Sequence, residues 1–90
     1  MKIYTITLSE DGLSMDAYTN IKALFNGINK TSYIPLTIDI GASQVKFNYS
    51  NLVQAVNYHT KNGKYYCFHL IVNCKYDYQI VVKELRIIKS

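Results

Sequence analysis

Four segments of this chain alternate apolar and polar residues, which is the period-two pattern of β-strands that bury one face. They cover residues 2–8, 33–40, 65–73 and 78–88, and Val45–Phe47 adds a short return strand. In the second segment the pattern predicts inward side chains at Ile34, Leu36, Ile38 and Ile40. Pro35 belongs to the outward set, which indicates that this strand lies at a sheet edge or begins there. In the last segment the apolar positions change parity, which predicts a β-bulge near Lys83 and Glu84.

Two other segments space their apolar residues as amphipathic helices do. The first carries Ile21, Leu24, Phe25 and Ile28, and the second carries Leu52, Ala55, Val56 and His59. Thr19 and Ser50 stand where a helix N-cap is expected. The polar stretch Ser9–Asp16 is expected to be a loop, and residues 74–77 are expected to form a turn.

Together these segments predict one α+β domain over residues 1–90, in the order β-α-β-β-α-β-β. Two helices would cover one face of a mainly antiparallel sheet. The predicted core joins Ile21, Leu24, Phe25, Leu52 and Val56 of the helices to Ile6, Leu8, Ile38, Phe68 and Leu70 of the strands. Residues 18–26 align with residues 49–57, so an αββ unit occurs twice, through duplication or through convergence on one capping sequence.

The charge is unevenly distributed along the chain. The net charge is +4, but residues 1–45 carry −1 and residues 46–90 carry +5. This asymmetry favours a polyanion or an acidic protein as partner of the second half, although codon bias toward lysine explains part of it equally well. No apolar run is long enough to span a membrane, and no signal-peptide pattern begins the chain, so we expect a cytoplasmic protein of the host cell cytosol.

Catalysis and metal binding find little support in the sequence. It contains no glycine-rich phosphate loop, no GxSxG, no HExxH and no CxxC, so we expect no enzyme and no cofactor. Cys67, His69, His59 and Cys74 could be drawn together as zinc ligands, but their spacing fits none of the usual zinc motifs. We therefore expect no metal site, and we expect both cysteines to be free thiols.

Binding to DNA or RNA has the best support. On the second helix, Asn51, Gln54, Tyr58 and Lys61 share the polar face, and Asn, Gln and Lys are residue types that contact base edges. Lys64 and Tyr65 follow that helix, and Lys75 and Tyr76 occupy the next turn. Bases interleaved with aromatic rings can pair phosphate contacts with stacking on unpaired bases. The sequence thus predicts a nucleic-acid-binding module in which these eight residues form the interface.

A protein partner is the alternative. Nine tyrosines on so small a body must leave several rings exposed, with Tyr33, Tyr65, Tyr76 and Tyr78 as the outward candidates. An exposed sheet edge could also add a partner strand or pair two copies as a homodimer. No membrane partner is expected.

The composition points in the same two directions. Ile, Asn, Lys and Tyr supply 37 of the 90 residues, a bias typical of AT-rich coding. In size, in this bias and in its lack of catalytic motifs, the chain resembles small accessory proteins of phages and mobile elements of low-GC bacteria. That group includes DNA-binding regulators and inhibitors of host defence such as anti-CRISPR proteins. The resemblance implies either DNA binding or stoichiometric occlusion of a host defence complex.

Overall fold

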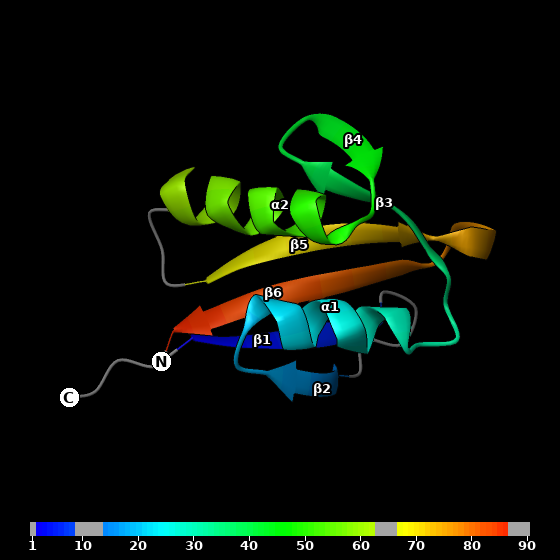
Figure 1. Ribbon diagram of the computed structural model, residues 1–90, viewed down its shortest axis with the longest axis horizontal. Helices are drawn as coiled ribbons and strands as arrows, with labels where there is room; N and C mark the ends of the chain where they lie inside the picture. Colours follow the sequence, from blue (N-terminus) through cyan, green and yellow to red (C-terminus); the bar gives the residue numbers. More distant parts are fainter. Residues whose placement is uncertain (1, 9–13, 63–66, 87–90) are drawn as a thin grey trace.

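The computed structural model describes residues 2–8, 14–62 and 67–86 of the chain. Within them, six strands form one antiparallel sheet in the order β2-β1-β6-β5-β3-β4, and both helices cover the same face (Figure 1). The elements are β1 (Lys2–Leu8), β2 (Ser14–Tyr18), α1 (Ile21–Asn29), β3 (Pro35–Ile40), β4 (Ser43–Lys46), α2 (Tyr49–Asn62), β5 (Cys67–Cys74), the 3-10 turn η1 (Lys75–Asp77) and β6 (Gln79–Arg86). The predicted α+β class and the two helices on one face are confirmed.

β2 is a strand that the sequence does not reveal. The stretch Ser9–Asp16 was expected to be a loop, but β2 begins at Ser14 and pairs antiparallel with β1, with Tyr18 opposite Tyr4. Its sequence SMDAY lacks the alternation of a half-buried strand, because β2 forms the edge of the sheet. Pairing with β1, and not an apolar pattern of its own, makes this segment a strand.

Both helices are capped by asparagine, so the predicted caps Thr19 and Ser50 are wrong. The Asn20 side chain accepts a hydrogen bond from the Ala23 amide at 2.8 Å. The Asn48 side chain does the same for the Asn51 amide, also at 2.8 Å. In both cases the amide oxygen reaches the third residue of the helix, as an N-cap does. The two helices therefore begin at different points of the 18–26 and 49–57 match.

The core lies between the helices and one face of the sheet. Its buried members include Ile6, Leu8, Leu24, Ile38, Leu52, Val56 and Leu70, as predicted. Ile21 and Phe25 are only partly buried, and the side chain of Phe68 lies outside the described residues. Burying one side chain of this size stabilises a fold by about 1.5–3 kcal/mol.

β6 runs straight, so the bulge predicted near Lys83 and Glu84 is wrong. Its pairing with β1 and with β5 continues through these residues without a register shift. The alternation of Ile80 and Val82 therefore continues to Glu84, whose side chain is buried at 1% exposure. Because Glu84 is charged, the sequence shows a polar residue at an inward position, and this break in the apolar alternation suggested a bulge that the strand does not have.

The start of β3 departs from the predicted alternation. The register with β5 shifts between Pro35 and Thr37, which breaks the period of two at Leu36. Ile34 and Leu36 were expected to face inward but are 54% and 51% exposed. β3 is an inner strand, so it does not lie at a sheet edge. It begins at Pro35, which is the other position predicted for this proline.

Candidate nucleic-acid interface

α2 presents a polar face, as its sequence predicts. Gln54 and Tyr58 are exposed, Asn51 is partly buried, and Leu52 and Ala55 on the opposite side are buried. Three of the predicted interface residues cannot be placed, because the side chain of Lys61 and all of Lys64 and Tyr65 lie outside the described residues.

Asn51 has a structural role in this fold. Its side-chain amide nitrogen donates to the Lys46 carbonyl oxygen at 2.7 Å, while its backbone amide is capped by Asn48. A bidentate contact to adenine needs both the oxygen and the nitrogen of the amide. One hydrogen of this nitrogen is thus engaged, and Asn51 ties the start of α2 to the end of β4.

The described residues of the predicted interface lie in two places. β5 runs from the end of the molecule where α2 ends to the opposite end, where Lys75 and Tyr76 belong to η1 (Figure 1). Eight residues of extended chain span about 26 Å at ~3.3 Å per residue. Lys75 and Tyr76 therefore lie far from the last turns of α2, which carry Tyr58.

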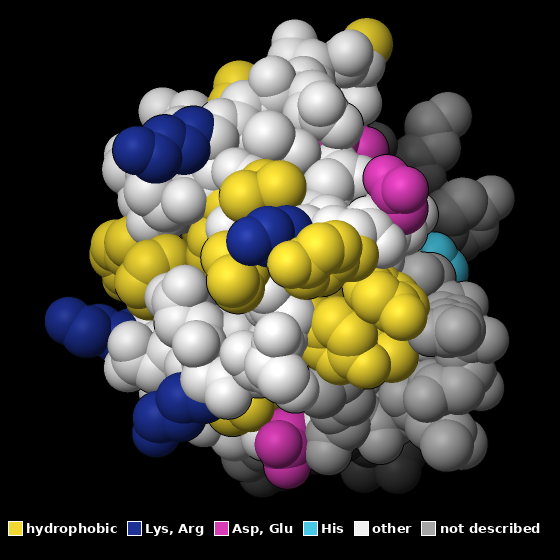
Figure 2. All heavy atoms as spheres, turned by 90° about the vertical axis from the view of Figure 1, so that its right-hand side faces the viewer, with side chains coloured by type: hydrophobic (Ala, Val, Ile, Leu, Met, Phe, Trp, Pro, Cys, Tyr) yellow, Lys and Arg dark blue, Asp and Glu magenta, His cyan; other side chains and the backbone are white. Residues whose placement is uncertain are grey.

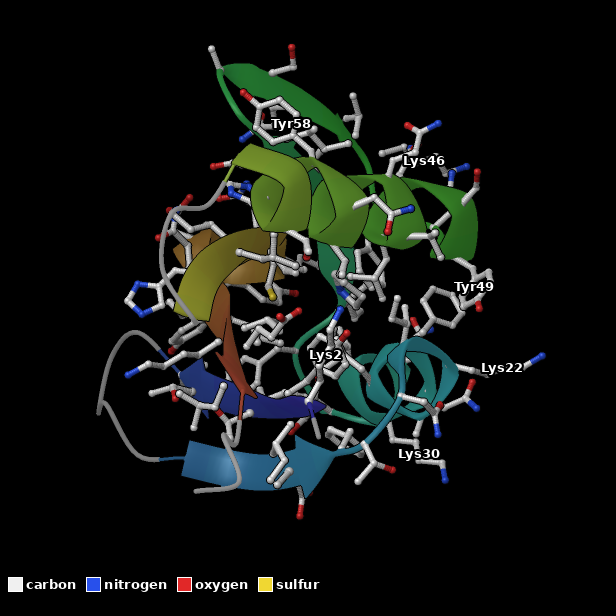
Figure 3. The ribbon with its side chains drawn as sticks, turned by 90° about the vertical axis from the view of Figure 1, so that its left-hand side faces the viewer. Lys2, Lys22, Lys30, Lys46, Tyr49 and Tyr58 are labelled. Carbon is white, nitrogen blue, oxygen red and sulfur yellow. The ribbon has the colours of Figure 1, made fainter. Side chains whose placement is uncertain are left out.

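Three lysines outside the predicted interface lie near the helices instead. Lys22 of α1, Lys30 at the C-cap of α1 and Lys46 at the end of β4 are exposed, and Figure 3 shows them on the same side of the molecule as Tyr49. We call these four residues the basic helix face. Lys22 and Lys30 were not among the predicted interface residues, because in the sequence they belong to a half with net negative charge.

Acidic groups are nearly absent from the same part of the chain. Between Thr19 and Asn62, Asp39 is the only acidic residue. It follows the buried Ile38 on β3, so it points to the face of the sheet away from the helices. There its carboxylate accepts hydrogen bonds from Asn73 at 3.0 Å and from Gln44 at 3.4 Å. This carboxylate therefore lies away from Lys22 and Lys30, whereas Lys46 shares its face of the β3-β4 pair.

An aromatic cluster joins α1 to the start of α2 beneath these lysines. The ring of Phe25 stacks on Phe47 and meets the edge of Tyr49, each at 5.5 Å between centroids. Tyr49 remains 43% exposed, and the Lys22 ammonium lies 6.0 Å from its ring centroid. The cluster holds an accessible tyrosine ring next to an accessible cation, which is a geometry that can stack on a base and contact its phosphate.

Of the four residues considered for a zinc site, the structure describes the side chains of His59, His69 and Cys74. Among the residues that the structure describes, no group of three or more His, Cys, Asp or Glu side chains could hold a metal ion. Burial lowers the pKa of His59 and raises the pKa of the Cys74 thiol. Cys74 is a buried free cysteine, as expected, whereas the side chain of Cys67 is not described.

Comparison with known proteins gives no further guidance. No protein family, no curated protein and no solved structure matches this chain. Within the described part of the chain, neither helix has the length and apolar character needed to cross a bilayer.

Proposed function

We propose that this chain is a non-enzymatic nucleic-acid-binding module and that the basic helix face is its interface. The observation that carries the proposal is the separation of charge: Lys22 and Lys30 are exposed on the helix side and Lys46 is exposed at the edge strand β4, while Asp39 accepts hydrogen bonds on the face of the sheet away from the helices. A duplex or a single strand presents closely spaced phosphates, so exposed lysines grouped around the helices match its backbone.

Tyr49 and Gln54 add contacts of a second kind. Tyr49 is half-exposed beside Lys22, and a base that stacks on its ring would place its phosphate near that ammonium. Gln54 is exposed on α2 and can contact a base edge. Lysine contacts of this kind favour binding through the backbone over recognition of one sequence.

Fluorescence anisotropy with labelled double-stranded DNA, single-stranded DNA and RNA tests the proposal. If three lysines contact duplex phosphates, counterion release predicts roughly a 40-fold loss of affinity between 50 and 200 mM salt. The double variant Lys22→Glu with Lys30→Glu should weaken binding more than tenfold and flatten the salt dependence. Absence of binding by the wild-type chain at 50 mM salt would refute the proposal.

A matched control separates the interface from the overall charge. Lys75→Glu with Lys83→Glu makes the same change in net charge on η1 and on the opposite face of the sheet, so its effect should be much smaller. Equal losses in the two double variants would mean that binding follows net charge alone. Lys61→Glu with Lys64→Glu tests whether the interface continues past the end of α2.

Occlusion of a host defence protein is the alternative that the sequence left open. Such a complex should respond little to salt compared with nucleic-acid binding, since its core would be apolar. The same anisotropy series therefore distinguishes the two functions.

A further inference from the structure

Tyr49 is an exposed ring that other aromatic rings hold in place. It is the first residue of α2, and its side chain is 43% exposed. Phe25 of α1 meets it edge-on, with ring centroids 5.5 Å apart and ring planes at 76°. Phe25 in turn stacks on the buried Phe47. The covered part of the Tyr49 ring therefore packs on a fixed aromatic support, and its exposed part remains accessible to a ligand.

The backbone that carries Tyr49 is held on both sides of this residue. The Phe47 amide donates to the Leu36 carbonyl oxygen at 3.0 Å, which joins the segment before α2 to β3. The Asn48 carbonyl oxygen accepts from the Leu52 amide at 2.9 Å, which closes the first turn of the helix. A ring on a fixed backbone loses little conformational freedom when a ligand packs on it, so little of the binding free energy is spent on ordering.

A lysine of the other helix lies over this ring. The Lys22 ammonium is 6.0 Å from the Tyr49 ring centroid, and both side chains are exposed. Figure 3 shows the two residues on the same side of the molecule, with Lys30 further along α1. The contact of an exposed ammonium with a ring is weak in water, and the lysine stem is flexible, so the ammonium can move from the ring to a nearby phosphate. Ring and cation together offer a stacking surface with a phosphate contact beside it.

We propose that Tyr49 receives an unpaired base and that the basic helix face takes single-stranded nucleic acid. This inference rests on the function proposed above and names the form of nucleic acid that it leaves open. In a duplex both faces of an interior base are covered by neighbouring bases, so a side chain reaches them only as a wedge between base steps. More than half of the Tyr49 side chain is covered by protein, so it does not project far enough to act as a wedge. An unpaired base can lie on the ring while its phosphate contacts Lys22.

Tyr76 also lies beside a lysine, but the charges around it differ. The Lys75 ammonium is 5.1 Å from the Tyr76 ring centroid, and the end of the molecule that carries η1 faces the viewer in Figure 2. The exposed Asp77 belongs to the same turn, so its carboxylate balances Lys75 and a phosphate gains little there. α1, which carries Lys22, contains no acidic residue. We therefore assign the stacking contact to Tyr49 and not to Tyr76.

Strands with and without bases test the stacking contact. Fluorescence anisotropy at low salt compares a labelled oligo(dT), an abasic strand with the same phosphates and a duplex of equal length. The wild type should prefer oligo(dT) to both. Tyr49→Leu should weaken binding to oligo(dT) about tenfold and leave the affinity for the other two probes nearly unchanged, whereas Tyr49→Phe keeps the ring and should bind as the wild type does. A wild type that prefers the duplex, an equal loss on all three probes, or no loss on oligo(dT) would overturn the inference.

The inference and the proposed function fail in different ways. If the wild type binds none of the three probes, the proposed function is refuted and the base contact with it. If Lys22→Glu with Lys30→Glu weakens binding to oligo(dT) but Tyr49→Leu does not, the lysines still bind the backbone and only the base contact is overturned.

Photocrosslinking locates the base without any substitution in the protein. An oligo(dT) in which one thymine is replaced by 5-iodouracil forms adducts with aromatic side chains that stack on this base. Its adduct with the saturated wild-type chain should map to Tyr49 by peptide mass spectrometry. No adduct, or an adduct at Tyr58 or Tyr76 with none at Tyr49, would overturn the inference. Urea unfolding shows whether Tyr49→Leu is folded, and the crosslink decides the question if it is not.

Discussion

Gly27 shows how a single position is fixed by its neighbour. It is buried on α1, and a Cβ built there would overlap the ring of Tyr18. In an exposed helix interior, replacing glycine by alanine stabilises by up to about 1 kcal/mol. Here we expect Gly27→Ala to destabilise by about 1–3 kcal/mol, because the ring must move from its packed position. Urea unfolding measures the difference in unfolding free energy. In a chain that already carries Tyr18→Ala, adding Gly27→Ala should instead raise the free energy of unfolding, as it does in an exposed helix interior.

His59 makes folding sensitive to pH near neutrality. Burial lowers its pKa below the ordinary value of 6.5, so the unfolded chain takes up a proton before the folded chain does. Its contribution to stability is therefore complete above pH 6.5 and is lost as the pH falls from 6.5 toward the folded pKa. We expect the urea midpoint to fall between pH 7.5 and 5.5. In His59→Gln that decline should be smaller, and an equal decline would assign it to other groups.

At the scale of the elements, asparagine side chains define where both helices begin. Asn48 caps α2 in the geometry that Asn20 provides for α1. Removing such a cap costs about 1 kcal/mol, so Asn48→Ala should lower the free energy of unfolding by that amount. Ser50 is the second residue of α2, so Ser50→Ala should change the free energy of unfolding by less than about 0.5 kcal/mol. Guanidinium unfolding of the two variants compares them directly, and the reverse order would restore Ser50 as the cap.

Elements with a strong period of their own could be predicted from the sequence, and elements defined by neighbours could not. α1, α2, β1 and β5 each carry buried residues at regular spacing. β2 lacks such a pattern because it lies at the sheet edge and depends on β1. The exposure of Leu36 depends on a register shift against β5, and Glu84 is buried by a strand that continues straight. Such features arise between segments distant in sequence.

At the scale of the whole molecule, folding brings together charges that belong to different halves of the sequence. The polar face of α2 could be predicted because it belongs to one helix. The contribution of Lys22 and Lys30 could not, since only folding places α1 beside α2 (Figure 3). One signal was nevertheless present in the sequence: the near absence of acidic residues between Thr19 and Asn62.

The sheet order makes the last strand essential to the entire fold. β6 lies between β1 and β5, so it joins the β2-β1 hairpin to the other half of the sheet, and its Ile80 and Val82 are fully buried. Pairing of Lys2 with Arg86 brings together residues from nearly opposite ends of the chain, which predicts slow folding for so small a domain.

A chain that ends at Tyr78 keeps both helices and five strands but loses β6. Without it, β1 and β5 lose their shared partner and the core loses two buried side chains, so we expect residues 1–78 to be unfolded. Amide proton dispersion in a nitrogen-edited NMR spectrum measures this, with the full chain as reference. A peptide of residues 79–90 added in trans should restore dispersed resonances, because it supplies the missing strand between β1 and β5. A folded 1–78 fragment would show that the two halves of the sheet are held together by the helices alone.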